Sequence, residues 1–177
     1  GQLDGAAEAY RQAMAIKPDY PQAQLNLGST LIELGEPLAA EACYRDAIAR
    51  HPGFAPALLN LGNLLRGRGE LDEALALLNR AIETDPSFAD AHNSLGNVYR
   101  DLGRIDEARG CYRAALSAQP DHARAHANLA YITTHGTDDP DVAAMESLLA
   151  REGLDVESET QLRFGLAKAY EESGEDT

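Results

Sequence analysis

The stretch from Ala55 to Phe88, APALLNLGNLLRGRGELDEALALLNRAIETDPSF, has the pattern of two amphipathic helices joined by a glycine-containing turn and closed by a proline. Similar stretches recur on both sides of it, always 34 residues apart. Three series of residues share this interval: Pro18, Pro52, Pro86 and Pro120; Gly28, Gly62 and Gly96; and Gly35, Gly69 and Gly103. Three series in one register indicate a repeat array, in which each unit buries its apolar face against its neighbours.

The repeat predicts an all-α fold, an α-solenoid of antiparallel helix pairs with about ten helices. We expect a capping box at Ser158–Gln161 to open the last helix. The predicted helices are Leu3–Ile16, Pro21–Leu34, Pro37–Arg50, Ala55–Arg68, Leu71–Thr84, Ala89–Leu102, Ile105–Ala118, Ala123–Thr134, Pro140–Arg151 and a last helix that ends near Glu172. Residues 1–136 then form a repeat array (a half repeat, three full repeats and the first helix of a fourth). Residues 137–177 form a degenerate repeat with a terminal helix.

Small residues recur in the middle of predicted helices and call for a packing explanation. Glycine in a helix interior is less favourable than alanine by about 1 kcal/mol, so we expect a second helix to approach closely there. These small residues are Gly28, Gly62, Gly96 and Ala130, and the expected facing residues are Ala40, Ala74, Ala108, Tyr44, Leu78, Tyr112, Ala47, Ala81 and Ala115. In the last helix we expect Leu162, Leu166, Ala167 and Tyr170 to point inward. Cys43 and Cys111, two repeats apart, are predicted to be small buried residues too distant for a disulfide.

These markers resemble the tetratricopeptide repeat over residues 1–134. The family's Leu-Gly pair is matched at Leu27-Gly28, Leu61-Gly62 and Leu95-Gly96, and its alanine, aromatic and proline positions are those given above. The family's early tryptophan is replaced, by Gln24, Leu58, His92 and His126. The resemblance implies a right-handed α-solenoid, a superhelix of paired helices that binds protein partners.

Composition and charge narrow the classes of partner. The net charge of −14 argues against nucleic acid or an anionic membrane as the main partner, and no apolar run approaches the roughly 18 residues that span a bilayer. Residues 137–177 carry 12 acidic and 3 basic residues, so this segment differs from the array. The first residues show no signal peptide, which predicts a cytoplasmic protein. Because the chain begins partway through a repeat, we also expect upstream sequence.

The sequence contains no catalytic motif, so we expect neither an enzyme active site nor a cofactor within this chain. A glycine-rich phosphate loop, GxSxG and HExxH are all absent. Asp138, Asp139 and Asp141 precede or open a predicted helix and are interpreted as an N-cap cluster rather than a cation site. His92 and His126 occupy equivalent packing positions, and no cysteine or carboxylate completes a metal site with them.

Polar residues recur on the first helices of the repeats, which line the concave surface of such a solenoid. Asn26, Asn60 and Asn128 share one slot, interrupted by Ser94, and Ser29, Asn63, Asn97 and Tyr131 share another. An asparagine side chain offers donors and an acceptor, which suits a grip on peptide main chain; the alternative is that these residues cap local backbone or are simply solvated. The predicted peptide-binding residues are Asn26, Asn60, Asn63, Arg66, Asn93, Asn97, Arg100, Asn128 and Tyr131.

Two further resemblances concern function. The asparagine slots resemble those of O-GlcNAc transferase repeats, which hold substrate peptides. They differ from repeats that clamp the carboxylate tails of chaperones, because the expected lysine slot holds Leu25, Leu59, Asn93 and Ala127. The stretch with Phe164, Leu166, Ala167, Lys168, Ala169 and Tyr170 resembles the junction between repeats and a sulfotransferase domain in bacterial proteins. That resemblance implies a catalytic domain beyond Thr177.

Three hypotheses about function remain open. The favoured one is a scaffold that binds an extended peptide or protein on its concave face. The second is a module that presents substrate to a sulfotransferase or an O-GlcNAc-transferase-like enzyme. The third is end-to-end self-association through exposed terminal helices. The sequence does not name the ligand or the oligomeric state.

Overall fold

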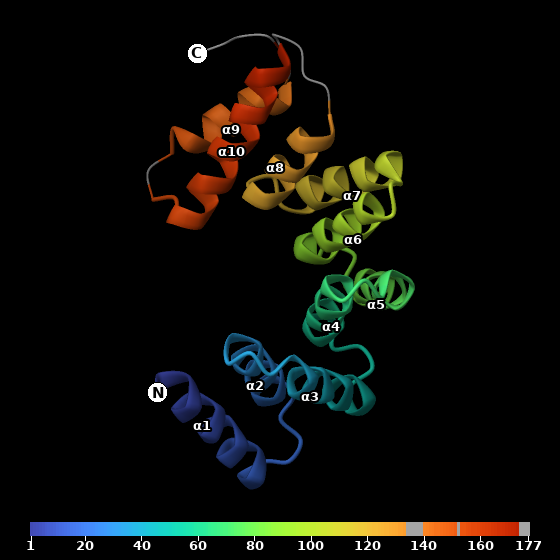
Figure 1. Cartoon of the computed structure of the whole chain (residues 1–177), viewed down its shortest axis with the longest axis vertical. Helices are drawn as coiled ribbons and strands as arrows, with labels where there is room; N and C mark the ends of the chain where they lie inside the picture. The colour runs from blue at the N-terminus through green and yellow to red at the C-terminus, as the bar shows by residue number, and fades with distance from the viewer. Residues whose placement is uncertain (134–139, 152, 174–177) are drawn as a thin grey trace. The chain divides into compact units, whose positions relative to one another are not determined.

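The computed structural model describes residues 1–133, 140–151 and 153–173, and all regular structure in these ranges is helical (Figure 1). The helices are α1 Gln2–Ile16, α2 Pro21–Glu33, α3 Pro37–Arg50, α4 Ala55–Gly67, α5 Leu71–Thr84, α6 Ala89–Asp101, α7 Ile105–Ala118, α8 Ala123–Ile132, α9 Pro140–Leu149 and α10 Val156–Ser173. The predicted all-α fold is confirmed, and the predicted ends agree within one or two residues except at the start of α10. The predicted roles of Thr134, Asp138 and Asp139 fall outside the described residues.

The chain forms two compact units, residues 1–86 and 87–177, which we describe separately. In the first unit α2 pairs with α3 and α4 with α5, while α1 packs on α2 and α3 packs on α4. In the second unit α6 pairs with α7, and α7 packs on α8. No helix in the part of the chain that the structure describes is long and apolar enough to cross a bilayer.

The turn between the helices of a pair depends on glycine. Gly35 follows α2 with a φ of 77°, in the left-handed region that glycine enters without a steric penalty. The backbone N–H of Glu36 then donates to the carbonyl of Leu31 at 2.8 Å, which closes the end of the helix. Gly69 and Gly103 have the same conformation after α4 and α6, so the constant interval reflects a repeated backbone requirement.

The mid-helix glycines allow the two helices of a pair to touch. A Cβ atom at Gly96 would lie 2.5 Å from Cε1 of Tyr112, and one at Gly62 would lie 2.9 Å from Cγ of Leu78. Real Cβ atoms essentially never approach so closely, and Tyr44 crowds Gly28 in the same way. The predicted facing residues Ala40, Ala74, Ala108, Tyr44, Leu78, Tyr112, Ala47, Ala81 and Ala115 are all at most 2% exposed. The close approach predicted from sequence is therefore confirmed.

Helix α10 begins earlier than predicted because a different residue caps it. Oδ1 of Asp155 accepts a bond from the backbone N–H of Ser158 at 2.9 Å, and the Ser158 hydroxyl donates to Oδ2 at 2.6 Å. These bonds lower the pKa of Asp155. The prediction that the capping box Ser158–Gln161 starts this helix is wrong, because Ser158 already lies in the first turn.

The inward face of α10 also differs in part from the prediction. Leu162 and Leu166 are buried in a cluster with Met145 and Leu148 of α9, as expected. Ala167, however, is exposed, and Gly165 faces inward instead. A Cβ atom at Gly165 would lie 3.0 Å from Cα of Ala127 in α8. Helix α10 packs closely against α8 as well as α9, so a glycine rather than an alanine is needed at this contact.

Both cysteines are free and half-buried, rather than fully buried as predicted. Burial raises the pKa of Cys43, and it raises the pKa of Cys111 to about 11, with a smaller contribution from the nearby Glu107. Neither thiol therefore has thiolate character near neutral pH.

Candidate functional site

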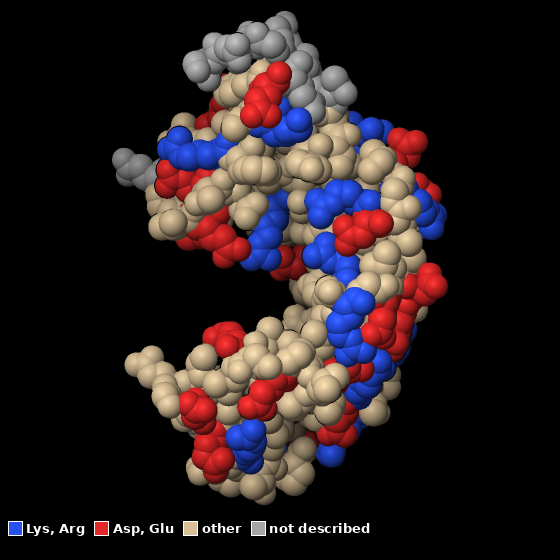
Figure 2. Space-filling model, viewed as in Figure 1, with Lys and Arg blue, Asp and Glu red and all other residues tan. Residues whose placement is uncertain are grey.

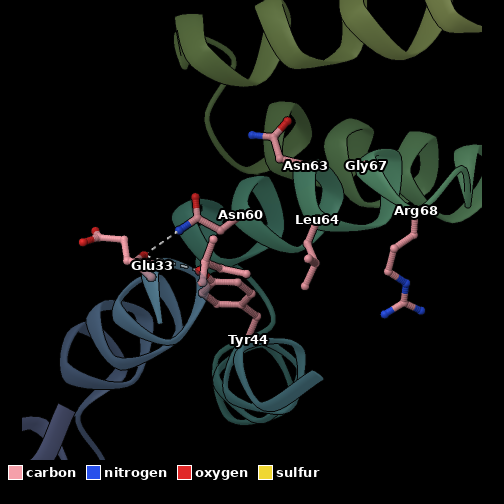
Figure 3. Close-up of a pocket in the computed structure, with 9 residues that line it drawn as sticks. Glu33, Tyr44, Asn60, Asn63, Leu64, Gly67 and Arg68 are labelled. Atoms are coloured by element: carbon pink, nitrogen blue, oxygen red, sulfur yellow. Dashed lines mark hydrogen bonds between the residues drawn. The ribbon is translucent and has the colours of Figure 1, made fainter. Parts of the chain in front are cut away.

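A groove with a volume of about 610 Å³ lies in the first unit where α2 and α4 meet above Tyr44 of α3 (Figure 3). Its apolar walls come from Ile32 and Leu64, and its polar groups come from Ser29, Tyr44, Asn60 and Asn63. Glu33 and Arg68 add charged side chains to the lining. A volume of this size is within the range of roughly 300–1,000 Å³ that ligand sites usually have.

Hydrogen bonds inside the groove fix the orientation of Asn60. Its Nδ2 donates to Oγ of Ser29 at 3.3 Å, and the Ser29 hydroxyl lies 3.4 Å from the hydroxyl of Tyr44. Burial raises the pKa of Tyr44, so its hydroxyl is neutral at physiological pH. The carbonyl oxygen of Asn60 points away from Tyr44 (Figure 3). Asn60 is thus held in one orientation, with its carbonyl oxygen directed outward as a hydrogen-bond acceptor.

Asn63 differs from its equivalents in neighbouring repeats. Among the described residues its exposed side chain makes no hydrogen bond, and it points away from Asn60 and Tyr44 (Figure 3). The equivalent Ser29 and Asn97 each contact the hydroxyl of a tyrosine 15 residues later, Tyr44 and Tyr112, at 3.4 and 2.9 Å. The corresponding residue for Asn63 is Leu78, which has no hydroxyl. Asn63 is therefore left for other partners.

The cation at the rim of this groove is already paired. Arg68 contacts the carboxylates of Glu41 and Glu70, and Arg45 bonds to Glu41 and Glu73 at 2.8 Å each. These arginines lower the pKa of Glu41. On the face shown in Figure 2, acidic and basic side chains are likewise interleaved. The groove therefore offers amide groups on apolar walls, with a paired cation in Arg68 and a carboxylate in Glu33.

In the second unit several of the predicted residues bond to one another. Nδ2 of Asn128 donates to Oδ1 of Asn93 at 2.9 Å, and Nη1 of Arg100 donates to Oδ1 of Asn128 at 3.3 Å. The Arg100 guanidinium also lies 6.0 Å from the ring centroid of Tyr131. Asn97 accepts a hydrogen bond at 2.9 Å from the hydroxyl of Tyr112 on α7, so its carbonyl oxygen is engaged within the protein.

A second pocket, of about 300 Å³, lies where α6, α8 and α10 meet. Arg100, Asn128 and Tyr131 line it, together with Ala127, Gln161 and Phe164. Sequence reasoning missed Gln161 and Phe164 as site residues, because their packing against α8 depends on contacts distant in the chain. The aromatic side chain of Phe164 in an otherwise amphipathic helix was the available signal.

Four predicted residues line neither cavity, namely Asn26, Arg66, Asn93 and Asn97. Asn26 accepts a hydrogen bond from Gln22 on the same helix at 2.9 Å, which is a local contact. Arg66 is half-buried on α4 and does not line the groove. The structure thus brings together Asn60 and Asn63 in one unit, and Asn93, Arg100, Asn128 and Tyr131 in the other.

His122 forms a polar site at the start of α8 that the sequence did not indicate. Its Nδ1 accepts a bond from the backbone N–H of Ala125 at 3.2 Å, and its Nε2 lies 3.1 Å from Oδ1 of Asp90. An acceptor at Nδ1 requires the proton to be on Nε2, which donates to Asp90. This bond lowers the pKa of Asp90. Among the described residues no group of three or more His, Cys, Asp or Glu is arranged to hold a metal ion.

Comparisons with known proteins agree with this architecture. Three family models match, two described as "Tetratricopeptide repeat" over residues 25–89 and 65–132 and one as "TPR repeat" over residues 1–35. The stretch that resembles a sulfotransferase junction lies beyond the matched residues. A comparison with curated proteins gives no match.

Several solved structures are similar to this chain. A thermophilic TPR protein of Thermus thermophilus aligns with a TM-score of 0.75 and 25% identity, over 94% of this chain and 92% of that one. MamA aligns with a TM-score of 0.64 and 25% identity, over 97% and 89%. An O-GlcNAc transferase mutant of Thermobaculum terrenum aligns with a TM-score of 0.64 and 28% identity, over 72% of this chain but 25% of that protein.

The repeat interval, the glycine-mediated helix contacts, the family matches and the similar structures all agree. The predicted α-solenoid is confirmed, and residues 1–132 of the chain are tetratricopeptide repeats.

Proposed function

We propose that the chain is a protein-interaction scaffold whose first unit holds an extended peptide by its main chain, in the groove between α2 and α4. The observation that carries the proposal is the placement of Asn60 and Asn63 on apolar walls in a groove of about 610 Å³. Asn60 presents its carbonyl oxygen and Asn63 its whole amide, so both a peptide N–H and a peptide C=O find a partner. The paired state of Arg68 leaves little selection by charge.

The tetratricopeptide fold supports this proposal in a general way, since repeats of this kind form extended binding surfaces. The likeness to the O-GlcNAc transferase favours a second candidate: the chain serves as the substrate-presenting part of a larger transferase. The downstream reading frame tests this candidate. A donor-binding domain encoded after Thr177 would support it, and a frame that ends without one would contradict it.

Two substitutions test the main-chain grip. A peptide is first selected from a random displayed library on the whole chain, and its affinity is then measured by fluorescence anisotropy. Replacing both Asn60 and Asn63 by alanine should weaken binding about tenfold, because each hydrogen bond contributes about 0.5–1.5 kcal/mol. Methylation of single peptide nitrogens in the ligand should weaken binding at the positions that face the groove.

The matched control is Asn79→Ala on α5, whose amide donates to the carbonyl of Leu75 in its own helix. It should leave the affinity unchanged. All variants should keep the unfolding temperature of the parent chain, and light scattering over a concentration series checks for self-association. An unchanged affinity in the folded Asn60/Asn63 double variant would contradict the proposal.

A further inference from the structure

We propose that the pocket between α6, α8 and α10 selects the sequence of the bound peptide. In the bound peptide, an aromatic side chain packs against Tyr131 and Phe164. An aspartate or glutamate adjacent to it in the peptide pairs with Arg100. This inference rests on the proposed peptide-binding function and adds a preference that the groove of the first unit does not supply.

Two aromatic rings are exposed at this one pocket. Tyr131 is 52% exposed and Phe164 is 59% exposed, and both line the cavity. The whole chain has only 7 tyrosines and 3 phenylalanines, so two exposed rings at a single site are a concentrated apolar surface. Aromatic residues and arginine are enriched where proteins bind one another, because they bury much area with few rotatable bonds. The pocket of about 300 Å³ is at the lower end of the usual range, which suits one large side chain.

Among the described residues that line this pocket, Arg100 is the only cation, and neighbouring side chains hold it in place. It donates to Asn128 at 3.3 Å, packs near the ring of Tyr131, and lies 3.9 Å from the carboxylate of Asp101. A guanidinium has five N–H donors, so these contacts leave donors for a ligand carboxylate. Because the side chain is already ordered by its neighbours, a ligand does not have to immobilise it.

Because the chain is acidic, we expect the pocket to prefer a peptide with one acidic residue beside Arg100 rather than several. The net charge of −14 disfavours a strongly acidic ligand, whereas one carboxylate beside Arg100 finds a complementary partner. The groove of the first unit differs, because its Arg68 contacts Glu41 and Glu70 and its apolar walls are aliphatic. The two cavities therefore have different chemistry, and only the second one favours an aromatic residue followed or preceded by an acid.

The test uses four labelled peptides that share one serine–alanine frame and carry Phe-Glu, Phe-Gln, Ala-Glu or Phe-Lys at its centre. Affinities for the whole chain are measured by fluorescence anisotropy at low and at high salt. Phe-Glu should bind most tightly, with Phe-Gln weaker by about two- to fivefold, as expected for a partly exposed ion pair. Ala-Glu should bind about tenfold more weakly, since the aromatic side chain fills the pocket. Salt should weaken Phe-Glu more than Phe-Gln.

Variants assign these effects to the pocket. Arg100→Glu should reverse the order of Phe-Glu and Phe-Lys, and Phe164→Ser should remove the preference for phenylalanine over alanine. Val156→Ser is the matched control, because Val156 is an exposed apolar residue of the same helix outside the pocket and should change neither preference. Circular dichroism confirms that each variant is folded, which is expected because Phe164 and Val156 are exposed.

The outcomes separate this inference from the proposed function. If the four peptides bind with equal affinity, the chain binds peptides but this pocket does not select them, and the inference is overturned. If Arg100→Glu leaves the order of the peptides unchanged, the assigned role of Arg100 is wrong. If neither these peptides nor any member of a random displayed library binds, the proposed function fails together with the inference.

Discussion

Substitution of Gly96 by alanine should destabilise the second unit, although alanine is the better helix former. An added Cβ atom would lie 2.5 Å from Cε1 and 2.7 Å from Cδ1 of Tyr112. The ring cannot turn aside easily, because it is fully buried and its hydroxyl is bonded to Asn97 at 2.9 Å. Overpacking of this kind costs about 1–3 kcal/mol, and a rigid ring in contact at two atoms places Gly96→Ala near the upper end. The gain in helix propensity is about 1 kcal/mol, so unfolding should become easier by about 2 kcal/mol.

The assay is thermal and urea unfolding followed by circular dichroism at the helix band. A loss of about 2 kcal/mol corresponds to a decrease of roughly 4–8 °C in the unfolding temperature for a chain of this size. Gly110→Ala is the matched control, because Gly110 lies in the middle of α7 with no atom within 4 Å of its added Cβ. It should stabilise the chain by about 0.5–1 kcal/mol. If Gly96→Ala were as stabilising as Gly110→Ala, the close contact with Tyr112 would not explain the repeated glycine.

Three further predictions use the same geometry and the ionisable groups. Gly62→Leu should lower the free energy of unfolding by about 1–3 kcal/mol or more, measured by urea titration, because the larger side chain meets Leu78. The folded pKa of Asp90 is lowered by His122, so its stabilising effect is present above the ordinary carboxyl pKa and is lost as pH falls through the lowered pKa. Asp90→Asn should therefore flatten the acid side of the stability–pH curve. Alkylation of Cys111 should be slow near neutral pH and rise about tenfold per pH unit towards its pKa of about 11, as mass spectrometry of iodoacetamide-treated protein can show.

The fold could be predicted from sequence because its determinants are local and repeated. A glycine with a positive φ, such as Gly35, follows the end of a helix, and Gly69 and Gly103 repeat this conformation at the 34-residue interval. The predicted start of α10 was wrong because Asp155 and Ser158 are both residue types that cap helices. Only the path of the backbone decides which of them is the cap. The inward position of Gly165 was missed because it depends on the approach of α8, which is distant in the sequence.

The candidate site was less predictable, since spacing shows which residues share a helix face but not which of them bond to one another. Asn93 and Asn128 are 35 residues apart, and their side chains bond directly. Arg100 joins this pair by donating to Asn128 of α8. Phe164 reaches the same pocket from a helix outside the regular 34-residue series. Hydrogen bonds between repeats therefore limit which polar residues remain for a ligand.

A hydrogen bond within one repeat can be introduced by substitution, and it tests whether the availability of Asn63 matters. Ser29 and Asn97 contact the hydroxyls of Tyr44 and Tyr112, whereas the residue 15 positions after Asn63 is Leu78, which has no hydroxyl. A tyrosine fits beside a glycine in both neighbouring pairs, so Leu78→Tyr should fold and should place a hydroxyl within reach of Asn63. Because Asn63 would then donate or accept within the protein, peptide affinity should fall by several-fold, about the effect of one hydrogen bond, while Leu78→Phe should retain it. Equal affinities for the tyrosine and phenylalanine variants would show that Asn63 does not contact the ligand.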